Sequence, residues 1–190
     1  RGVPRMSPTL LSRRLGELEE AGILRREPLD GDSGHWGYIL TEAGRDLGAV
    51  VEAMGNWGQK WVDADLSLAN LDPALLMWDM RRNLDPSPMP GSRAVIAFRY
   101  GDQPADRRDW WLIVEPGEPV DLCSVEPGFE IDLTVETDLR CMTEIWMGLT
   151  TVDREARRDR LILTGDPRLA GTMQRWLGLS PFASHTKRRM

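Results

Sequence analysis

Side chains that could contact a nucleic acid gather near the start of the chain. In and just before the stretch MSPTLLSRRLGELEEAGIL, residues 6–24, hydroxyl and basic side chains come first: Arg5, Ser7, Thr9, Ser12, Arg13 and Arg14. Three acids then follow, Glu17, Glu19 and Glu20, so only the first half of the stretch suits a polyanion. Hydroxyl and guanidinium groups bind base edges and phosphates in DNA. This order of charge indicates a helix that enters a DNA groove by its N-terminal end.

The same stretch predicts the helix that would carry these side chains. Ser7 can accept a hydrogen bond from a free N–H group of the first turn, and Pro8 fits the first helical position. Residues at helical spacing form one apolar stripe, which ends at a glycine: Leu11, Leu15, Leu18 and Gly22. An ordinary amphipathic surface helix would show the same stripe. The choice between a DNA-recognition helix and an ordinary surface helix therefore depends on the residues that follow.

A β-hairpin is predicted directly after this helix. Two runs of extended-type residues, 24–28 and 35–40, flank the polar loop DGDSG at 30–34. The order of helix, hairpin and further helix is that of a winged helix, in which the hairpin is the wing. Arg26 and His35 could contact DNA phosphates from the wing. The alternative is that Arg26 is only solvated and that His35 is an ordinary loop residue.

A second helix is predicted from its capping residue Thr41 to about Ala64. A helix of about 22 residues rises about 33 Å, which is more than a small winged domain needs. Its apolar stripe contains two tryptophans and is a candidate interface: Val50, Met54, Trp57 and Trp61. We expect this stripe to pack against a second subunit or against the following domain. Core packing inside the monomer is the alternative.

Composition favours a globular protein with a packed core. The chain has 190 residues, 41% of them hydrophobic, which suits one large or two small domains. No apolar run approaches the roughly 20 residues of a membrane span, and the first residues, RGVPRMSP, contain no apolar signal-peptide core. We therefore expect a cytoplasmic protein with no membrane span. The net charge of −6 argues against a nucleic-acid coat, although DNA affinity depends on local charge.

Residues for catalysis or metal binding are few. Cys123 and Cys141 lie 18 positions apart, outside any CxxC or Cys/His cluster, so we expect small buried side chains and neither a zinc site nor a disulfide scaffold. The two histidines, His35 and His185, lie in the wing and in the tail. The sequence has no GxSxG elbow, glycine-rich phosphate loop or HExxH motif. We expect no enzyme activity, no cofactor and no bound metal.

The second half of the chain begins after a boundary at 64–73. A helix is predicted from Pro73 to about Asn83, with Asp72 as its cap. Four β-like runs separated by turns are typical of an antiparallel meander: 93–100, 109–115, 120–125 and 129–135. In the last run, apolar residues alternate with polar ones, which predicts one buried and one exposed face: Phe129, Ile131, Leu133 and Val135.

Helices are expected to cover this sheet. Asp138 is predicted to cap a helix with one apolar stripe: Leu139, Met142, Ile145, Trp146 and Leu149. A further turn at 152–157, a strand at 160–163 and a last helix from Asp166 follow. That last helix turns four apolar residues inward: Leu169, Met173, Trp176 and Leu177.

Residues 1–61 resemble the HxlR family of bacterial winged-helix repressors. The matching phrases are SPTLLSRRLGELEEAGIL, the wing, and LTEAGRDLGAVVEAMGNWGQKW. The resemblance implies that the wing lies along the DNA backbone, that the Thr41 helix helps to form a dimer, and that four side chains meet base edges or phosphates in the major groove: Ser7, Thr9, Ser12 and Arg13. It also implies earlier helices that brace the recognition helix, so we expect DNA binding to need residues upstream of Arg1. Some members sense oxidants through a cysteine in the winged domain, which this sequence lacks there, so redox sensing is not carried over.

Residues 71–179 resemble a sterol-carrier-protein-like domain. The matching phrases are IDLTVETDLRCMTEIWMGLTT and RLILTGDPRLAGTMQRWLGL. This resemblance implies a sheet covered by helices around an apolar cavity that takes a lipid-like or other hydrophobic small molecule. Large side chains that could line such a cavity are Trp110, Trp111, Phe129, Leu133, Met142, Ile145 and Trp146. A solid core made of the same residues is the alternative, since burial is favourable in both cases.

Together these patterns predict an α+β chain. A winged helix-turn-helix domain is expected at 1–64, with a dimerisation helix at 42–64, followed by a linker at 65–73. A sterol-carrier-like domain with an antiparallel or mixed sheet covered by helices is expected at 74–180, and a basic tail at 181–190. We expect a homodimeric transcriptional regulator that binds double-stranded DNA and responds to a hydrophobic small molecule. The alternatives are a carrier of lipids or other hydrophobic ligands, in which the winged helix serves only for dimerisation, and a second domain that only dimerises.

Overall fold

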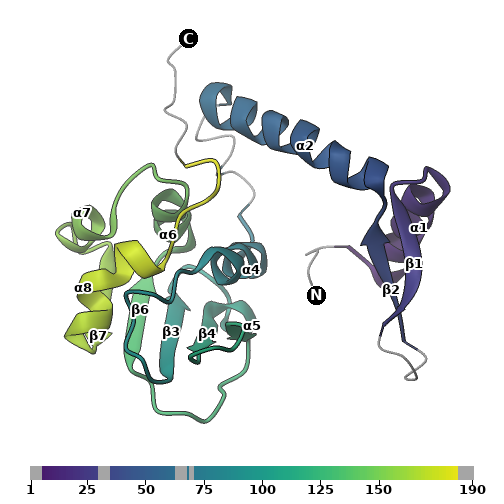
Figure 1. The fold of residues 1–190 in the computed structure, drawn as a ribbon. Helices are drawn as coiled ribbons and strands as arrows, with labels where there is room; N and C mark the ends of the chain where they lie inside the picture. Colours follow the sequence, from purple (N-terminus) through teal and green to yellow (C-terminus); the bar gives the residue numbers. More distant parts are fainter. Residues whose placement is uncertain (1–5, 30–34, 63–67, 69–70, 184–190) are drawn as a thin grey trace.

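The computed structural model describes residues 6–29, 35–62, 68 and 71–183 (Figure 1). These residues form a two-stranded sheet near the N-terminus and a five-stranded sheet in the second half of the chain. Several predicted features lie outside the described residues: Arg5, the wing loop 30–34, most of the linker and the tail from 184. The predicted fold class, a winged helix followed by a helix-covered sheet, is confirmed.

The first helix begins and ends close to where the sequence predicts. α1 (Pro8–Glu20) is capped by Ser7, whose Oγ accepts a hydrogen bond from the N–H of Leu10 at 3.2 Å. Gly22 follows with a φ of +72°, a left-handed conformation that commonly ends helices and favours glycine. The cap and the stop are both local signals, which is why the sequence alone could identify them.

The hairpin predicted as the wing follows α1. β1 (Leu24–Leu29) and β2 (His35–Leu40) pair in antiparallel fashion, with Leu24 opposite Leu40 and Arg26 opposite Tyr38. Figure 1 shows α1 beside this hairpin. The predicted order of helix, hairpin and helix is therefore confirmed.

The next helix, α2 (Glu42–Trp61), is anchored to the hairpin by its first turn. Thr41 Oγ1 accepts a hydrogen bond from the N–H of Gly44 at 3.1 Å and donates one to the carbonyl oxygen of Gly22 at 2.6 Å. A Cβ atom on Gly44 would lie 2.2 Å from the carbonyl oxygen of Ile23. Glycine at this position therefore allows the helix and the hairpin to approach each other closely.

The far end of α2 contacts the second half of the chain. Gln59, which is buried, donates a hydrogen bond from Nε2 to the carbonyl oxygen of Met147 at 3.2 Å. One turn earlier, the ring of Phe182 lies against Gly55, where a Cβ atom would be 2.4 Å from it. The same helix therefore touches the wing at one end and the region around Met147 at the other (Figure 1).

The second half is built on a five-stranded sheet in the order β5-β4-β3-β6-β7. It follows α4 (Pro73–Asn83), which is capped by Asp72 as predicted. Its strands are β3 (Ala94–Tyr100), β4 (Asp109–Val114), β5 (Asp121–Cys123), β6 (Leu133–Thr137) and β7 (Leu161–Gly165). The first three form the predicted antiparallel meander, but β6 pairs in parallel with β3. The sheet is therefore mixed, and the prediction of a purely antiparallel meander is wrong for the fourth run.

The fourth run differs because Asp132 anchors it beside β3. Asp132 Oδ2 accepts a hydrogen bond from the N–H of Val95 at 2.7 Å, and the N–H of Asp132 donates to the carbonyl oxygen of Val95 at 2.9 Å. The chain continues from there alongside β3 in the same direction. Phe129 and Ile131, predicted to lie within the strand, are exposed residues of the preceding loop. Alternation alone does not separate a strand from such a loop.

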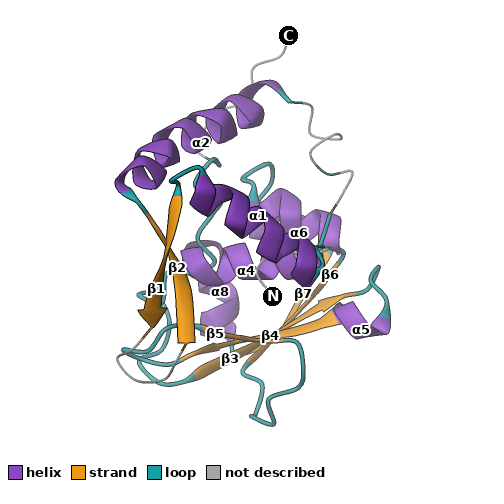
Figure 2. Ribbon diagram, turned by 90° about the vertical axis from the view of Figure 1, so that its right-hand side faces the viewer, coloured by secondary structure: helices purple, strands orange, loops and turns teal. Residues whose placement is uncertain are grey.

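Helices cover one face of this sheet. Figure 2 shows α4, α6 (Leu139–Trp146) and α8 (Pro167–Trp176) on the same side of it. Asp138 and Asp166 cap α6 and α8, as predicted. The structure adds α7 (Val152–Ala156), which was predicted, and α5 (Ala105–Arg108), which was not. Large, almost fully buried side chains fill the space between sheet and helices: Met77, Met80, Ile96, Phe98, Tyr100, Leu112, Met173 and Trp176.

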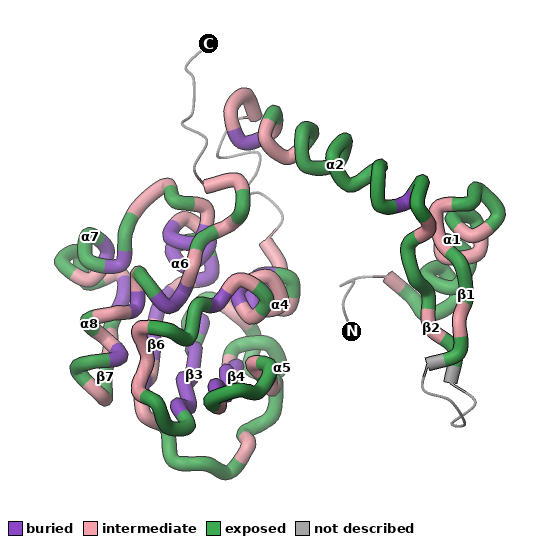
Figure 3. Tube along the Cα trace, in the orientation of Figure 1, coloured by how far each residue is buried: buried purple, intermediate pink, exposed green. Residues whose placement is uncertain are grey.

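Burial is concentrated in this second half of the chain (Figure 3). Within the described residues, α1 holds no buried residue and α2 holds only Gly44 and Gln59. Large apolar side chains of the N-terminal region are instead exposed: Leu10, Leu11, Leu18, Trp36, Val50, Met54 and Trp57. Such a concentration of exposed apolar residues is typical of a surface that another polypeptide covers.

Candidate DNA-binding and ligand-binding sites

The polar side chains predicted to read DNA lie together on α1. Thr9, Ser12 and Arg13 are exposed, and their spacing of three and four residues puts them on one side of the helix. Ser7 is exposed at the capped end of the same helix. The structure therefore brings these predicted contacts to one surface. Contact with DNA stays a prediction.

Two arginines of α1 share an acid of the same helix. Arg13 Nε lies 3.3 Å from Glu17 Oε1, and Arg14 Nη1 lies 2.6 Å from Glu17 Oε2. Both arginine side chains are more than half exposed, at 64% and 54%. Exposed ion pairs contribute only about 0–1 kcal/mol, so a phosphate can replace Glu17 at little cost.

Arg26 in the wing lies near two aromatic rings. Its guanidinium carbon is 5.7 Å from the ring centre of Trp36 and 5.7 Å from that of Tyr38. The sequence analysis predicted phosphate contact by Arg26 but missed these aromatic residues, although their spacing of two in HWGYIL indicates a common face of the strand. The side chain of His35, like Arg5, lies outside what the structure describes.

The predicted interface of α2 lies on an open side of the helix. Val50, Met54 and Trp57 are 54%, 69% and 62% exposed, and they line an apolar groove of about 450 Å³. Trp61, in the last turn, is less exposed. The contacts of α2 with Phe182 and Met147 come from the opposite side of the helix. The contact with the second half of the chain therefore leaves the predicted stripe available.

Five of the seven predicted ligand contacts belong to the packed core between the sheet and its helices: Trp110, Leu133, Met142, Ile145 and Trp146. Each of them is at most 9% exposed. Phe129 lies apart from this core at 41% exposure, with the guanidinium carbon of Arg93 4.5 Å from its ring centre. A ligand that touched the five core residues would have to open the contacts among them.

Trp111 faces the other side of the sheet, where it lines a pocket of about 190 Å³. The walls also include a cation and two acids: Arg99, Asp109 and Glu126. The indole Nε1 atom of Trp111 is buried and has no hydrogen-bond partner among the described residues. A buried donor without an acceptor costs about 1–3 kcal/mol. An acceptor that reached this atom would recover that hydrogen bond.

The charges beside the Trp111 pocket are held by ion pairs. Arg99 Nε lies 3.1 Å from Asp109 Oδ1, and Arg99 Nη1 lies 3.0 Å from Glu136 Oε1. The hydrogen bond with Asp109 is the largest of the effects that raise the pKa of Arg99. This wall of the pocket therefore keeps its cation, but largely neutralised by two carboxylates.

The two cysteines have environments that disfavour the reactive thiolate. Burial raises the pKa of the Cys141 thiol, which lies in the first turn of α6. Burial and the nearby Asp121 carboxylate raise the pKa of the Cys123 thiol. A thiol with a raised pKa stays protonated at neutral pH and reacts slowly. Neither cysteine therefore adds reactive chemistry to the sites described here.

Comparison with known proteins places the N-terminal part of the chain. The model of the HxlR-like helix-turn-helix family matches residues 1–66. An uncharacterized HTH-type transcriptional regulator of Mycobacterium bovis is 35% identical over 111 residues, covering 50% of this chain and 68% of that protein. The chain belongs to the HxlR-like helix-turn-helix family. The uncharacterized HTH-type regulator YvaP of Bacillus subtilis is 31% identical to this HxlR-like chain over 61 residues, covering 32% of the chain and 56% of YvaP.

Solved structures similar to this HxlR-like chain include sterol carrier proteins. Sterol carrier protein 2 from Yarrowia lipolytica is 13% identical with a TM-score of 0.39, and the match covers 57% of this chain and 93% of that one. The sec-alkylsulfatase Pisa1 from Pseudomonas is 16% identical with a TM-score of 0.43, over 63% of this chain but only 17% of the sulfatase. Likeness at this level carries no argument about ligand or activity. Ligand binding by the second half of the HxlR-like chain therefore stays a prediction.

Two further findings concern only the residues that the structure describes. None of the helices there combines the length and the apolar character that crossing a bilayer requires. That part of the chain also holds no group of three or more His, Cys, Asp or Glu side chains placed to bind a metal ion.

Proposed function

We propose that this HxlR-like protein is a non-enzymatic transcriptional regulator that binds double-stranded DNA. The observation that supports it is the capped helix α1, with Thr9, Ser12 and Arg13 exposed, followed directly by a hairpin that presents Arg26. In helix-turn-helix proteins the recognition helix contacts base edges with its N-terminal residues. We infer that α1 enters the major groove and that the hairpin lies along the neighbouring backbone.

Arg13→Ala is expected to weaken DNA binding. If Arg13 neutralises one phosphate, its loss should flatten the slope of log K against log salt concentration by about 0.9. The measurement is a fluorescence anisotropy titration, at several salt concentrations, of the full-length gene product on a duplex selected from a random-sequence pool. Arg157→Ala is the matched control, because Arg157 is an exposed arginine directly after α7 that also pairs with an acid four residues away, Asp153.

An unchanged slope in Arg13→Ala would show that Arg13 does not contact phosphate. A full-length product that selects no duplex from the pool would contradict the proposed function as a whole.

We further propose that the protein acts as a homodimer through the α2 stripe, which consists of the exposed Val50, Met54 and Trp57 and the half-buried Trp61. Removing each large apolar side chain from water contributes about 1.5–3 kcal/mol. With a twofold axis beside α2, the stripe of one subunit would cover the same stripe of its partner, as closed dimers require. The two recognition helices would then meet two half-sites of one operator.

We also propose that the second half of the chain holds a hydrophobic small molecule that changes DNA affinity. Such a ligand acts only if it binds one arrangement of the protein better than another. The Trp111 pocket supports this proposal because the buried Nε1 donor of Trp111 has no acceptor among the described residues. Native mass spectrometry of the purified protein would reveal a retained ligand. Operator affinity that stays the same with that ligand at saturation would contradict the coupling and leave DNA binding intact.

A carrier or sequestering protein is the competing proposal, with the winged helix serving only for dimerisation. The exposed α2 stripe fits this function equally well. A protein that retains a hydrophobic ligand but selects no DNA sequence would favour the carrier.

A further inference from the structure

A pocket of about 270 Å³ lies between Leu68, which precedes α4, and residues of α6, α7 and the segments that follow them. Charged side chains dominate its walls: Arg140, Arg154, Arg158 and Arg160, with Glu144 and Glu155. Four arginines against two glutamates leave a local formal charge of +2, although the whole chain carries −6. The pocket is therefore a local exception to the acidic character of the protein.

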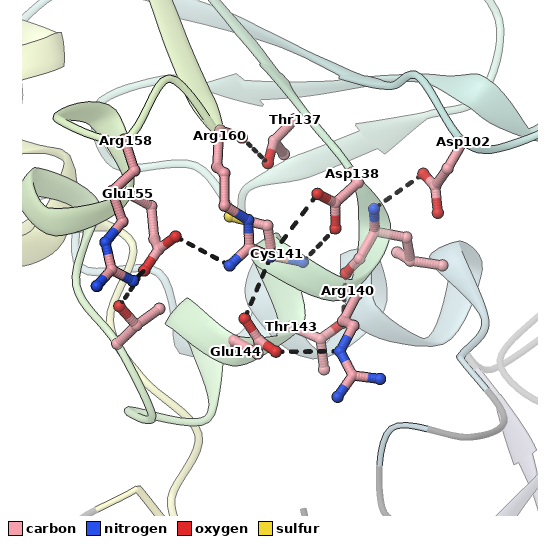
Figure 4. Close-up of polar contacts among 12 residues, drawn as sticks. Asp102, Thr137, Asp138, Arg140, Cys141, Thr143, Glu144, Glu155, Arg158 and Arg160 are labelled. Carbon is pink, nitrogen blue, oxygen red and sulfur yellow. Dashed lines mark hydrogen bonds and ion pairs between the residues drawn. The ribbon is translucent and has the colours of Figure 1, made fainter. Parts of the chain in front are cut away.

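Glu155 holds two of these arginines in place (Figure 4). Its carboxylate, in a side chain only 2% exposed, lies 3.1 Å from Arg160 Nη1 and 3.7 Å from Arg158 Nη1. The hydroxyl of Thr150 donates a third contact to it at 2.5 Å. A buried carboxylate is tolerated only when it is paired in this way. Glu155 therefore helps to fix two guanidinium groups at the pocket wall, and Arg160 also lies 3.4 Å from Glu144 and 3.8 Å from Asp138.

Arg154 differs from the other arginines of the pocket because no ion pair of the described residues includes it. Among the ion pairs of the described residues, Arg140 joins Glu144 at 3.1 Å and Arg157 joins Asp153, but none includes Arg154. Its exposed guanidinium lines the same pocket as those of Arg158 and Arg160. Guanidinium forks that line one pocket can match the oxygen atoms of a phosphate group.

The pocket also has an apolar side. Leu149 lines it from the segment after α6, and Leu68, 5% exposed, lines it from the connection between α2 and α4. A ligand with both an anionic end and an apolar end fits such a wall better than a bare ion does.

We propose that this pocket binds a small molecule with a phosphate monoester group. The phosphate oxygens meet Arg154, Arg158 and Arg160, and the apolar part lies against Leu68 and Leu149. Because Leu68 lies between α2 and α4 in the chain, occupancy changes the surroundings of Leu68. Control of DNA affinity by this route rests on the proposed function, whereas binding of the phosphate monoester does not.

The test is isothermal titration calorimetry of the full-length gene product, without DNA, against phenyl phosphate and inorganic phosphate. A parallel arm measures co-sedimentation with phosphatidylcholine vesicles that contain or lack phosphatidic acid, which presents the same chemical group as a lipid headgroup. Arg154→Gln removes the unpaired guanidinium from the pocket. Arg157→Gln is the matched control, because Arg157 is exposed on the same turn of the chain but does not line the pocket.

We expect saturable binding of phenyl phosphate. Its affinity should be at least about tenfold weaker in Arg154→Gln and unchanged in Arg157→Gln. Binding confined to phosphatidic acid vesicles, with the same dependence on Arg154, would identify the source of the phosphate as a lipid. No saturable binding in either arm, or an equal loss in both variants, would overturn the proposal. DNA selection by the same protein is scored separately, so either result can fail without the other.

Discussion

Trp57→Glu is expected to convert the proposed homodimer to a monomer and to weaken operator binding by about a hundredfold or more. Trp57 is 62% exposed at the centre of the α2 stripe, so the substitution leaves the core of the subunit untouched. In a twofold interface each substitution counts twice, and a central aromatic residue typically contributes about 2 kcal/mol or more. Two linked half-site contacts exceed a single contact by about 10²–10⁴ in affinity, and a monomer loses that gain.

Ala49→Glu is the matched control for this prediction. It adds the same charge to an exposed position of the same helix, away from the stripe. Sedimentation equilibrium should show dimers for Ala49→Glu and monomers for Trp57→Glu at the same protein concentration. Dimers in both variants would mean that subunits associate through another surface.

Glu155→Ala is expected to lower the free energy of unfolding by about 1–3 kcal/mol, because Arg160 and Arg158 lose a buried acceptor, although Arg160 stays paired with Glu144 and Asp138. Glu155 is 2% exposed in its side chain, and its carboxylate contacts both Arg160 and Arg158. Its loss also leaves the hydroxyl of Thr150 without its acceptor. Urea denaturation followed by circular dichroism measures the change.

Asp153→Ala is the matched control for Glu155. Asp153 lies two residues earlier on α7 and pairs with Arg157, but its side chain is 70% exposed. Exposed pairs contribute about 0–1 kcal/mol, so the midpoint should hardly move. Equal destabilisation by the two substitutions would show that burial of Glu155 does not matter.

Local signals account for most of what the sequence could predict. Ser7, Thr41, Asp72, Asp138 and Asp166 all cap helices in the structure, and each does so through a hydrogen bond to a backbone N–H two or three residues ahead. Such contacts depend only on neighbouring residues, so a single sequence reveals them. The HxlR resemblance rests on the same local phrases and was confirmed by the family match to residues 1–66.

Contacts between distant residues account for what the sequence could not predict. The parallel pairing of β6 depends on Asp132 meeting Val95, 37 positions earlier. That contact lies at the start of the pairing between β6 and β3, which the alternation around Phe129 does not indicate. Sequence patterns carry no information about such a partner, so the meander was the simpler interpretation.

The pocket lined by Arg154, Arg158 and Arg160 also depends on contacts that the sequence does not reveal. VDREARRDR looks like a solvated charged segment, and nothing in its spacing indicates that Glu155 is buried while Arg154 is exposed. The burial arises because Thr150 and Arg160 close over the carboxylate from either side of α7.

Trp110 and Trp111 are neighbours in the sequence, yet Trp110 lies in the core and Trp111 lies beside a pocket. The reason is that adjacent residues of a strand face opposite sides of the sheet.

Close packing at Gly44 allows α2 to transmit a displacement from one of its ends to the other. Close approach at Gly44 clamps one end of the helix to the hairpin, and Gln59 holds the other end to Met147. A helix of 20 residues is about 30 Å long and bends little, so a rotation of about 5° at one end displaces the other by roughly 2.5 Å. Half-sites on DNA lie about 34 Å apart, and base contacts do not tolerate a shift of that size at each end. In the proposed dimer, a small repacking near Met147 would therefore be enough to move the two α1 helices out of register with two half-sites on DNA.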